Sequence, residues 1–430
     1  MTQAIKENPQ RVRLGVLGGV RGLMVADYCK KTKGAELVAV CDFNPEVRAH
    51  CAARLQELGM DIAIVADFEE LLALRPDGIV LANYATEHAP FAIRCMAQGI
   101  AVLSEVLPAH TLRECVELVE AVEQHRGLYC YAENYCYMSA PRELKRLYQK
   151  GLLGELEYAE GEYLHNCEPI WHELTYGDPT HWRNNKHAFF YCTHSIGPII
   201  HATGLRAETV IGMELPHNAK MRRMGAKGAQ MSVEMLTLTN GAIVRSLHGQ
   251  SCRNSIRFSM IGSHGKAESA TEAQAIARPE DRGRMFVSLD IDPTDPDFSV
   301  DTYVPKNDYA QPEGLFHEIA DLYLLDNFVC AIKGEPHDTI DVYEAMDMYL
   351  PGLFAYRSAL NGGAPQTVPD FRKKEDRDLW RNDVACTDAS IAGEQLQPTT
   401  SRGTPFIDPT VYQTIQKKWQ DTCRSKEESL

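Results

Sequence analysis

The sequence lacks closely spaced cysteines, long apolar runs and an apolar segment at its beginning. Its 13 cysteines are scattered, mostly within apolar segments such as those around Cys41 and Cys95, and none forms a C-x-x-C pair. We therefore expect reduced, buried thiols rather than a disulfide framework. No run reaches the roughly 18 apolar residues that a membrane-spanning helix needs, and residues 1–9 have no signal-like apolar core. These absences predict a cytoplasmic protein.

Positive charge is also in short supply. The formal net charge is −15, and no basic amphipathic stretch offsets it. Phosphate-rich partners need basic surfaces, so this balance argues against binding nucleic acid or an anionic membrane. A length of 430 residues with 44% hydrophobic content is enough to fill two cores. We expect two domains and a small-molecule ligand.

The chain opens with the pattern of a nucleotide-binding βαβ unit. The apolar run 11–17 predicts a buried parallel strand, and a turn containing Gly18, Gly19, Arg21 and Gly22 follows it before a helical pattern begins at Leu23. Glycines at such a turn let the backbone approach a pyrophosphate at the N-terminus of the next helix. The spacing departs from G-x-G-x-x-G, so the motif is weak when taken alone.

An acidic residue strengthens the interpretation. The second predicted strand, 36–41, ends at Asp42, about twenty residues after the last glycine. A carboxylate there can accept hydrogen bonds from the adenosine ribose and would repel a ribose phosphate, which favours NAD over NADP. The alternative is a turn aspartate ahead of Asn44 and Pro45.

The βαβ rhythm continues through two more buried strands, 78–83 and 100–104. Cofactors bind at the carboxyl ends of parallel strands, so Asn83, His88 and Glu105 are predicted to line the nicotinamide side. His88 has an equally plausible alternative as an ordinary residue at a helix N-terminus. Asn134 is predicted to position cofactor or sugar.

The pattern changes near residue 140 to alternating strands, which are expected at 155–164, 209–213, 230–239, 242–249 and 255–261. Such strands favour an open, largely antiparallel sheet with helices on one face and a surface for subunit pairing on the other. The predicted fold is α/β: a Rossmann doubly wound parallel sheet followed by an α+β domain. The expected domains are an NAD-binding domain at 1–139, a substrate-binding and oligomerisation domain at 140–372, and a polar C-terminal arm at 373–430, ordered near 411–419.

Two segments of the second region carry candidate chemistry. Tyr191 and His194 stand about one helical turn apart, so two proton-transfer groups can share one cleft. The alternative is a Tyr and a His that merely cap a helix.

The loop 165–173 contains His, Cys and carboxylate side chains, which are all potential metal ligands. Together with Trp182 and Arg183, however, its polar groups suit a sugar, whose C–H surfaces pack on aromatic faces. We predict a sugar-binding loop and no metal, with His165, Trp182, Arg183 and Glu105 as substrate-binding residues. A surface loop without a ligand remains the third interpretation.

Several motifs together resemble the Gfo/Idh/MocA oxidoreductase family: the opening strand, residues 83–88 and residues 102–108. The E-K-P triplet of that family reads Glu105-Val106-Leu107-Pro108 here, so its lysine is absent. Glu105-Val106, residues 133–137, residues 161–166 and Tyr191-Cys192-Thr193-His194 resemble instead the NAD-dependent glycosidases of glycoside hydrolase family 109. Leu107 is an extra residue and Cys192 replaces a proline, which marks a divergent relative.

The resemblance implies a mechanism without paired carboxylates. The sugar is oxidised at C3 by NAD, loses the C2 proton, expels the C1 substituent, adds water and is reduced again at C3. His194 is predicted to accept the proton of the C3 hydroxyl, and Tyr163 or Tyr191 to act at C2. The predicted enzyme is a redox-neutral, NAD-dependent glycosidase. The alternatives are a net sugar 3-dehydrogenase and a non-catalytic NAD-binding regulator.

Overall fold

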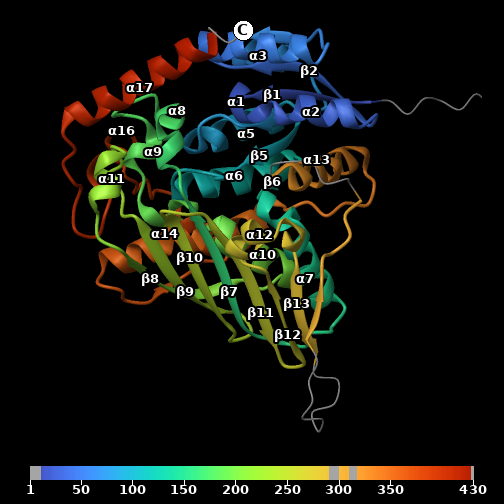
Figure 1. Cartoon of the computed structure of the whole chain (residues 1–430), viewed down its shortest axis with the longest axis vertical. Coiled ribbons are helices and arrows are strands. Elements are labelled where there is room, and N and C mark those ends of the chain that lie inside the picture. Colours follow the sequence, from blue (N-terminus) through green and yellow to red (C-terminus); the bar gives the residue numbers. More distant parts are fainter. Residues whose placement is uncertain (1–10, 290–299, 309–316, 428–430) are drawn as a thin grey trace, which may run out of the picture. The chain divides into compact units, whose positions relative to one another are not determined.

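The computed structural model describes residues 11–289, 300–308 and 317–427 (Figure 1). Its contacts divide the chain into two compact units. The first unit comprises Met1–His110, Glu114–Ala132 and Leu315–Ala345, and the second comprises Thr111–Arg113, Glu133–Gly314 and Met346–Leu430. Within the described residues, no helix is both long enough and apolar enough to cross a membrane.

The first unit is built on a six-stranded parallel sheet with the strand order β3-β2-β1-β4-β5-β6. Its strands are β1 (Val12–Leu17), β2 (Ala35–Cys41), β3 (Ala63–Val65), β4 (Gly78–Leu81), β5 (Ala101–Glu105) and β6 (Tyr129–Ala132). The helices are α1 (Gly19–Gly22), α2 (Met24–Lys31), α3 (Pro45–Glu57), α4 (Phe68–Ala73), η1 (Ala85–Glu87), α5 (His88–Ala97), α6 (Leu112–His125) and α13 (His317–Lys333). The central strands β4 and β5 are buried along their whole length, as continuous apolar runs predict. The predicted Rossmann sheet is confirmed.

The second unit contains a nine-stranded sheet with the order β14-β13-β12-β11-β7-β10-β9-β8-β15. Its strands are β7 (Leu156–His165), β8 (Ala207–Glu214), β9 (Met231–Leu238), β10 (Ile243–Gln250), β11 (Ser255–Gly262), β12 (Gly265–Ser269), β13 (Met285–Leu289), β14 (Asp301–Tyr303) and β15 (Gln366–Thr367). Every pair is antiparallel except β7 with β10. The five strands expected from alternation are present, and the open, largely antiparallel sheet is confirmed.

Helices of the second unit include α7 (Ser139–Gln149) and α10 (Thr193–Thr203), which pack on one face of this sheet. The others are η2 (Asn134–Tyr137), η3 (Glu168–Ile170), α8 (Trp171–Thr175), α9 (Trp182–Asn185), η4 (Ala188–Tyr191), α11 (Ala219–Arg223), α12 (Glu272–Ala277), η5 (Pro279–Asp281), α14 (Val342–Leu360), α15 (Lys374–Trp380), α16 (Ala389–Ala392), η6 (Gly393–Gln395) and α17 (Pro409–Glu427). Exposed apolar side chains from β8 and β9 include Ile211, Met213 and Met235. Subunit pairing through the sheet stays a prediction.

The division differs from the predicted domain boundaries 1–139, 140–372 and 373–430. The chain enters the second unit at Glu133 and returns to the first through α13. There, the ring of fully buried Phe328 lies so close to Gly78 of β4 that a Cβ on Gly78 would come within 2.8 Å of it. The apolar residues of α13 therefore complete the core of the Rossmann unit, a long-range contact that local sequence patterns do not reveal.

The polar C-terminal segment also differs from expectation, because it is folded beyond residues 411–419. Helix α17 spans Pro409–Glu427, and Ile415 packs into a buried cluster in the second unit. The other buried members of that cluster are Trp171, Met221, Met224 and Ala226. Tyr412 adds a hydrogen bond of 2.9 Å from its hydroxyl to the carbonyl of Gly225. An apolar stripe on a mostly polar helix thus anchors the end of the chain.

Helix α10 approaches β7 unusually closely, and Gly161 makes that approach feasible. A Cβ on Gly161 would lie 1.7 Å from the carbonyl oxygen of Ser195. The Ser195 hydroxyl also lies 2.7 Å from that of Ser246 on β10, which ties the helix to the sheet. Together these contacts fix the distance between α10 and the sheet.

Replacing Gly161 with Ala should therefore force α10 away from the sheet. We expect a loss of about 1–3 kcal/mol in the free energy of unfolding, measured by urea denaturation. Gly34→Ala is the matched control, because the nearest atom to its new Cβ would be 3.5 Å away. Equal stability of the two variants would contradict this account of the contact.

Candidate active site

The first unit presents a glycine turn shaped for close approach of a ligand. Gly18 has a φ of 96°, and a Cβ there would lie 2.4 Å from the backbone of Ala82. The amide nitrogen of Gly19 donates to Asp42 Oδ2 at 2.8 Å. A Cβ on Gly22 would lie 2.1 Å from Val16, so this glycine lets the helix rest directly on β1. A Cβ on Gly19 would lie 2.4 Å from the sulfur of Cys51, so each of these three glycines meets a close neighbour that a side chain would displace.

Asp42 stands at the end of β2 as predicted. Besides the bond to Gly19, its Oδ1 accepts a hydrogen bond of 2.8 Å from the amide of Asn44. The carboxylate thus joins the glycine turn to the start of α3, and it keeps lone pairs for a ligand hydroxyl. The turn role and the ribose role, posed as alternatives, are compatible in this geometry.

Arg21 and Glu105 form one ionic cluster with Asp321 of α13. Arg21 Nε lies 2.8 Å from Glu105 Oε1, and its terminal nitrogens lie 2.7 Å from both oxygens of Asp321. The Arg21 guanidinium is therefore paired within the protein. A cofactor role for Arg21 and Glu105 stays a prediction. Any cofactor that contacts one of them would contact a residue already held by the other members of the cluster.

His88 serves to join two loops at the carboxyl ends of the strands. Its Nδ1 lies 2.7 Å from the carbonyl of Leu107, and its Nε2 lies 3.3 Å from the carbonyl of Asn83. Burial lowers the pKa of His88 to about 4, so its ring is neutral at pH 7. This geometry fits a histidine that holds backbone in place.

Asn83 provides an observation that bears on a ligand. Both polar atoms of its side-chain amide are buried without a hydrogen bond of ordinary geometry, although the side chain interacts with the Glu87 carboxyl and opposes the rise in its pKa that burial causes. Buried amides are normally satisfied, so an outside group can add to that interaction. With the glycine turn and Asp42, this amide makes the edge of the sheet fit a dinucleotide.

The second unit holds a buried histidine–carboxylate pair. Nδ1 of His194, in the first turn of α10, lies 2.6 Å from Oε1 of Glu133, which follows β6. Glu133 is 0% exposed and His194 is 6% exposed. A carboxylate accepts at Nδ1, which leaves Nε2 of the imidazole free to accept a proton. The sequence motif included Glu133, but its role was not predicted.

Three tyrosine rings surround His194. Ring centroids lie 4.4 Å away for Tyr135, 4.6 Å for Tyr163 and 5.6 Å for Tyr191. The structure thus brings together all three residues predicted to be catalytic and adds Tyr135. Burial raises the pKa values of Tyr135 and Tyr163 well above the ordinary value for a phenol. At neutral pH these two phenols are donors rather than bases.

The predicted sugar-binding residues lie against Tyr191. The rings of Trp182 and Tyr191 are nearly parallel, at an angle of 10° and a centroid distance of 6.1 Å. The Arg183 guanidinium lies 4.4 Å from the Trp182 ring, and Lys186 Nζ lies 4.1 Å from the Tyr191 ring. Burial, with repulsion from Arg183, lowers the pKa of Lys186 to about 7. Lys186 was not predicted, because a lone lysine carries no local signal.

A pocket of about 60 Å³ lies beside this cluster in the second unit. Its walls include Tyr163, Tyr191, Arg183 and Lys186, together with Cys167 near predicted His165. Among the residues that the structure describes, none of those lining it is an Asp or Glu. The described part of the chain also has no group of three His, Cys, Asp or Glu residues that could hold a metal ion.

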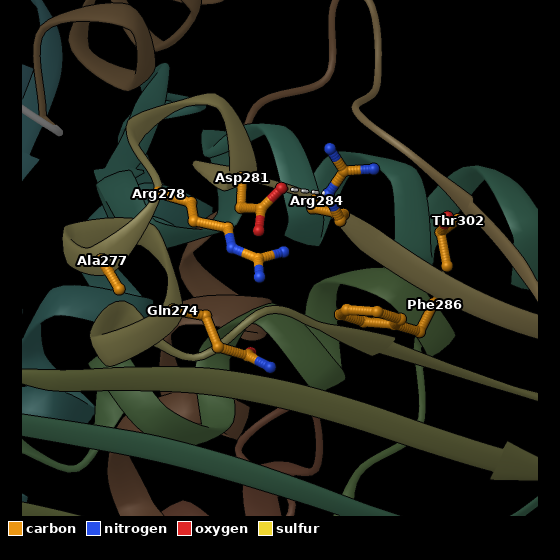
Figure 2. Close-up of a pocket in the computed structure, with 7 residues that line it drawn as sticks. All are labelled: Gln274, Ala277, Arg278, Asp281, Arg284, Phe286 and Thr302. Carbon is orange, nitrogen blue, oxygen red and sulfur yellow. Dashed lines mark hydrogen bonds and ion pairs between the residues drawn. The ribbon is translucent and has the colours of Figure 1, made fainter.

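A larger hollow, of about 590 Å³, lies elsewhere in the second unit, beside α12 and β13 (Figure 2). Figure 2 shows the Arg278 side chain reaching into it between Asp281 and Phe286. Asp281 forms an ion pair with Arg284, in which Arg284 Nε lies 2.6 Å from Asp281 Oδ1. None of the predicted site residues lines this hollow. The candidate site therefore lies at the smaller pocket and not at the larger hollow. Asn134, the remaining predicted residue, is buried at the start of η2.

Comparisons with known proteins agree with the Rossmann unit. Residues 12–133 match the model of the Gfo/Idh/MocA oxidoreductase family, described as having an NAD-binding Rossmann fold. Among solved structures, an oxidoreductase from Agrobacterium radiobacter in complex with NAD+, L-tartaric acid and magnesium has a TM-score of 0.67 at 15% identity, over 84% of this chain and 99% of that one. Levoglucosan dehydrogenase in complex with NADH and levoglucosan also has a TM-score of 0.67, at 18% identity, over 84% of this chain and 100% of that one. At these identities the likeness shows the fold.

Curated relatives extend the similarity through the second unit. Glycosyl hydrolase family 109 protein 5 of Phocaeicola vulgatus is 26% identical over 85% of this chain and 78% of its own length. A family 109 protein of Solibacter usitatus is 26% identical over 84% of this chain and 88% of its own length. The resemblance indicated by the motifs is thereby confirmed: residues 12–133 match the Gfo/Idh/MocA oxidoreductase model, and the chain is similar over most of its length to glycosyl hydrolase family 109 proteins.

Proposed function

We propose that this protein is an NAD-dependent glycoside hydrolase that cleaves small glycosides without net oxidation. The observation that carries the proposal is the His194–Glu133 pair beside a pocket whose described lining has aromatic and cationic groups but no carboxylate. An ordinary glycosidase needs two carboxyl groups across the scissile bond. The similarity to family 109 proteins and to an NAD-binding fold supports a sugar substrate and NAD.

The proposed chemistry assigns distinct duties to the residues. When bound, NAD supplies a hydride acceptor for C3 and later returns the hydride. His194 Nε2 takes the proton of the C3 hydroxyl, since Glu133 holds Nδ1. The new ketone makes the C2 proton acidic, so its removal expels the C1 substituent, and water then adds at C1. The phenols of Tyr163 and Tyr191 donate hydrogen bonds to sugar oxygens, and Trp182 and Arg183 form a wall of the sugar site.

Asp42 should make the protein prefer NAD to NADP. We expect NAD to raise the melting temperature more than NADP, because the carboxylate accepts from ribose hydroxyls and repels a ribose phosphate. Asp42→Asn keeps an oxygen acceptor for the Gly19 amide and removes the charge, so it should narrow that difference. Differential scanning fluorimetry with both cofactors measures it, and equal stabilisation of the wild type by both would refute this role.

His194→Ala should keep NAD binding and lose most turnover, by roughly 100- to 10,000-fold, because a general base is removed. Glu133→Gln should also lower kcat, because the neutral amide replaces the carboxylate that holds the His194 ring at Nδ1. Initial-rate kinetics with aryl glycosides, alongside NAD titration, separate catalysis from cofactor binding. Wild-type turnover in His194→Ala would remove this residue from the mechanism.

Turnover in deuterated water should place deuterium at C2 of the released sugar, because the C2 proton is removed and replaced. A thioglycoside should be cleaved as well, since elimination does not require protonation of an acetal oxygen. Mass spectrometry and NMR of the product test both expectations. Aglycone release without deuterium at C2 would contradict the mechanism, whereas oxidised sugar and NADH in equal amounts, with no aglycone, would identify the alternative 3-dehydrogenase.

A further inference from the structure

A cysteine that contacts a histidine lines the same pocket as Tyr163 and Tyr191. Cys167 lies two residues after the end of β7, and its sulfur lies 3.1 Å from Nδ1 of His165, the last residue of that strand. The amide of Cys167 donates to the Gln250 side chain at 3.1 Å, and the amide of Asn166 donates to the Asn254 side chain at 2.8 Å. The turn is thus held from two sides, and the sulfur has a defined position.

The sulfur faces both an apolar wall and the pocket. Cys167 packs against the buried cluster that includes Trp171 and Met221, and it lines the pocket with Tyr163 and Tyr191. Tyr163 stands two residues before His165 on the same face of β7 and contacts the His194 ring. Tyr163 therefore connects the cysteine–histidine pair to the rings around His194.

The surroundings lower the pKa of the Cys167 thiol and raise that of the His165 imidazole. Burial alone would raise the pKa of Cys167, but the hydrogen bond to His165, with nearby positive charge, brings that pKa below its ordinary value. The same hydrogen bond raises the pKa of His165. The charged or titratable groups that act on the pair from neighbouring elements are Tyr135, Tyr163, Arg183, Lys186, Lys220 and Glu272. A thiolate in such a setting is both a base and a nucleophile.

The proposed reaction needs a base at C2, and Tyr135 and Tyr163 suit that role poorly. Burial raises the pKa values of Tyr135 and Tyr163, so their phenolates are scarce at neutral pH. The sulfur of Cys167 lines the same pocket and has an adjacent imidazole to hold its charge. Resting on the proposed function, we propose that Cys167 is the group that takes the C2 proton of the 3-keto sugar, with His165 as its positioning residue.

The step balances without a further reagent. The C2–H bond breaks and an S–H bond forms on Cys167, while the electron pair left at C2 is delocalised toward the C3 ketone. That pair then forms the C1–C2 double bond, and the C1–O bond breaks as the aglycone leaves with its electrons and takes a proton from water. The hydroxide left by that water adds at C1, and Cys167, whose proton has exchanged with solvent, returns a proton to C2. Nothing is oxidised or reduced in this part of the cycle.

The first test measures the thiolate without relying on turnover. Purified holoenzyme is alkylated with iodoacetamide across a range of pH, and each cysteine is followed by peptide mass spectrometry. We expect Cys167 to react at lower pH than exposed Cys252, and His165→Gln to move the Cys167 profile at least tenfold in proton concentration toward higher pH. Identical pH profiles for the two cysteines, or an unchanged Cys167 profile in His165→Gln, would overturn the claim that His165 lowers the pKa of Cys167.

The second test supplies the ketone directly. Holoenzyme is mixed with an aryl glycoside already oxidised at C3, and aglycone release is followed. Cys167→Ala and Cys167→Ser should each slow release about 100-fold or more, although Ser preserves the shape of the side chain. Both variants should still reduce bound NAD in a first turnover with the parent glycoside, and Cys252→Ala should match wild type.

Wild-type release by Cys167→Ser, or its loss in Tyr163→Phe but not in Cys167→Ala, would overturn the assignment. If wild-type enzyme releases aglycone from neither the ketone nor the parent glycoside, the proposed function fails and the C2 role fails with it. The alkylation profile then still shows whether the thiolate pair exists, so the two failures are distinguishable.

Discussion

The arrangement of the candidate site in the second unit depends on one buried hydrogen bond, between Glu133 and His194. Glu133 is fully buried, its Oε1 lies 2.6 Å from the imidazole, and its Oε2 has no partner among the described residues. Removing a carboxylate from water is costly unless it is paired, so this bond fixes both the ring and its tautomer. The three tyrosine rings then pack around an imidazole whose direction is already set.

A polar network beneath α10 supports that arrangement. Ser195, next to His194, shares a hydrogen bond with Ser246, which lies 3.2 Å from Nδ1 of His248. Ser232 completes the chain at 2.9 Å from Nε2 of the same ring. Burial lowers the pKa of His248 to about 3, so the ring is neutral and can both donate and accept within this network. His194 is thus held by Glu133, while its neighbour Ser195 ties α10 to the sheet.

Sequence patterns predicted most of the fold because strand burial and alternation are local signals. The run 11–17, the glycine turn and Asp42 predicted the Rossmann edge, and alternation predicted the five central strands of the second sheet. The position of helix α13 in the first unit was not predicted, because it depends on a contact with Gly78, which is far away in the sequence. Periodicity likewise could not show that the polar C-terminal segment anchors itself through Ile415.

The candidate site shows the same division. Tyr191 and His194 were predicted from their spacing, and Trp182 and Arg183 from their composition, and the structure places all four in one cluster. The partnership of His194 with Glu133 joins residues 61 positions apart, so no local motif announces it. The loop 165–173 offered sugar, metal and surface interpretations, and only the geometry paired Cys167 with His165. Burial raises the pKa of Tyr163, which argues against its predicted role as a base at C2.

The central claim is that glycoside cleavage passes through a sugar oxidised at C3 while the cofactor ends unchanged. A single turnover of NAD-loaded enzyme with an aryl glycoside, followed by stopped-flow absorbance of reduced nicotinamide and of aglycone together, tests it most directly. We predict that the NADH signal rises before aglycone appears and then decays to its starting level, and that deuterium at C3 of the glycoside slows the rise. Aglycone release with no transient NADH and no isotope effect from C3 would contradict the account.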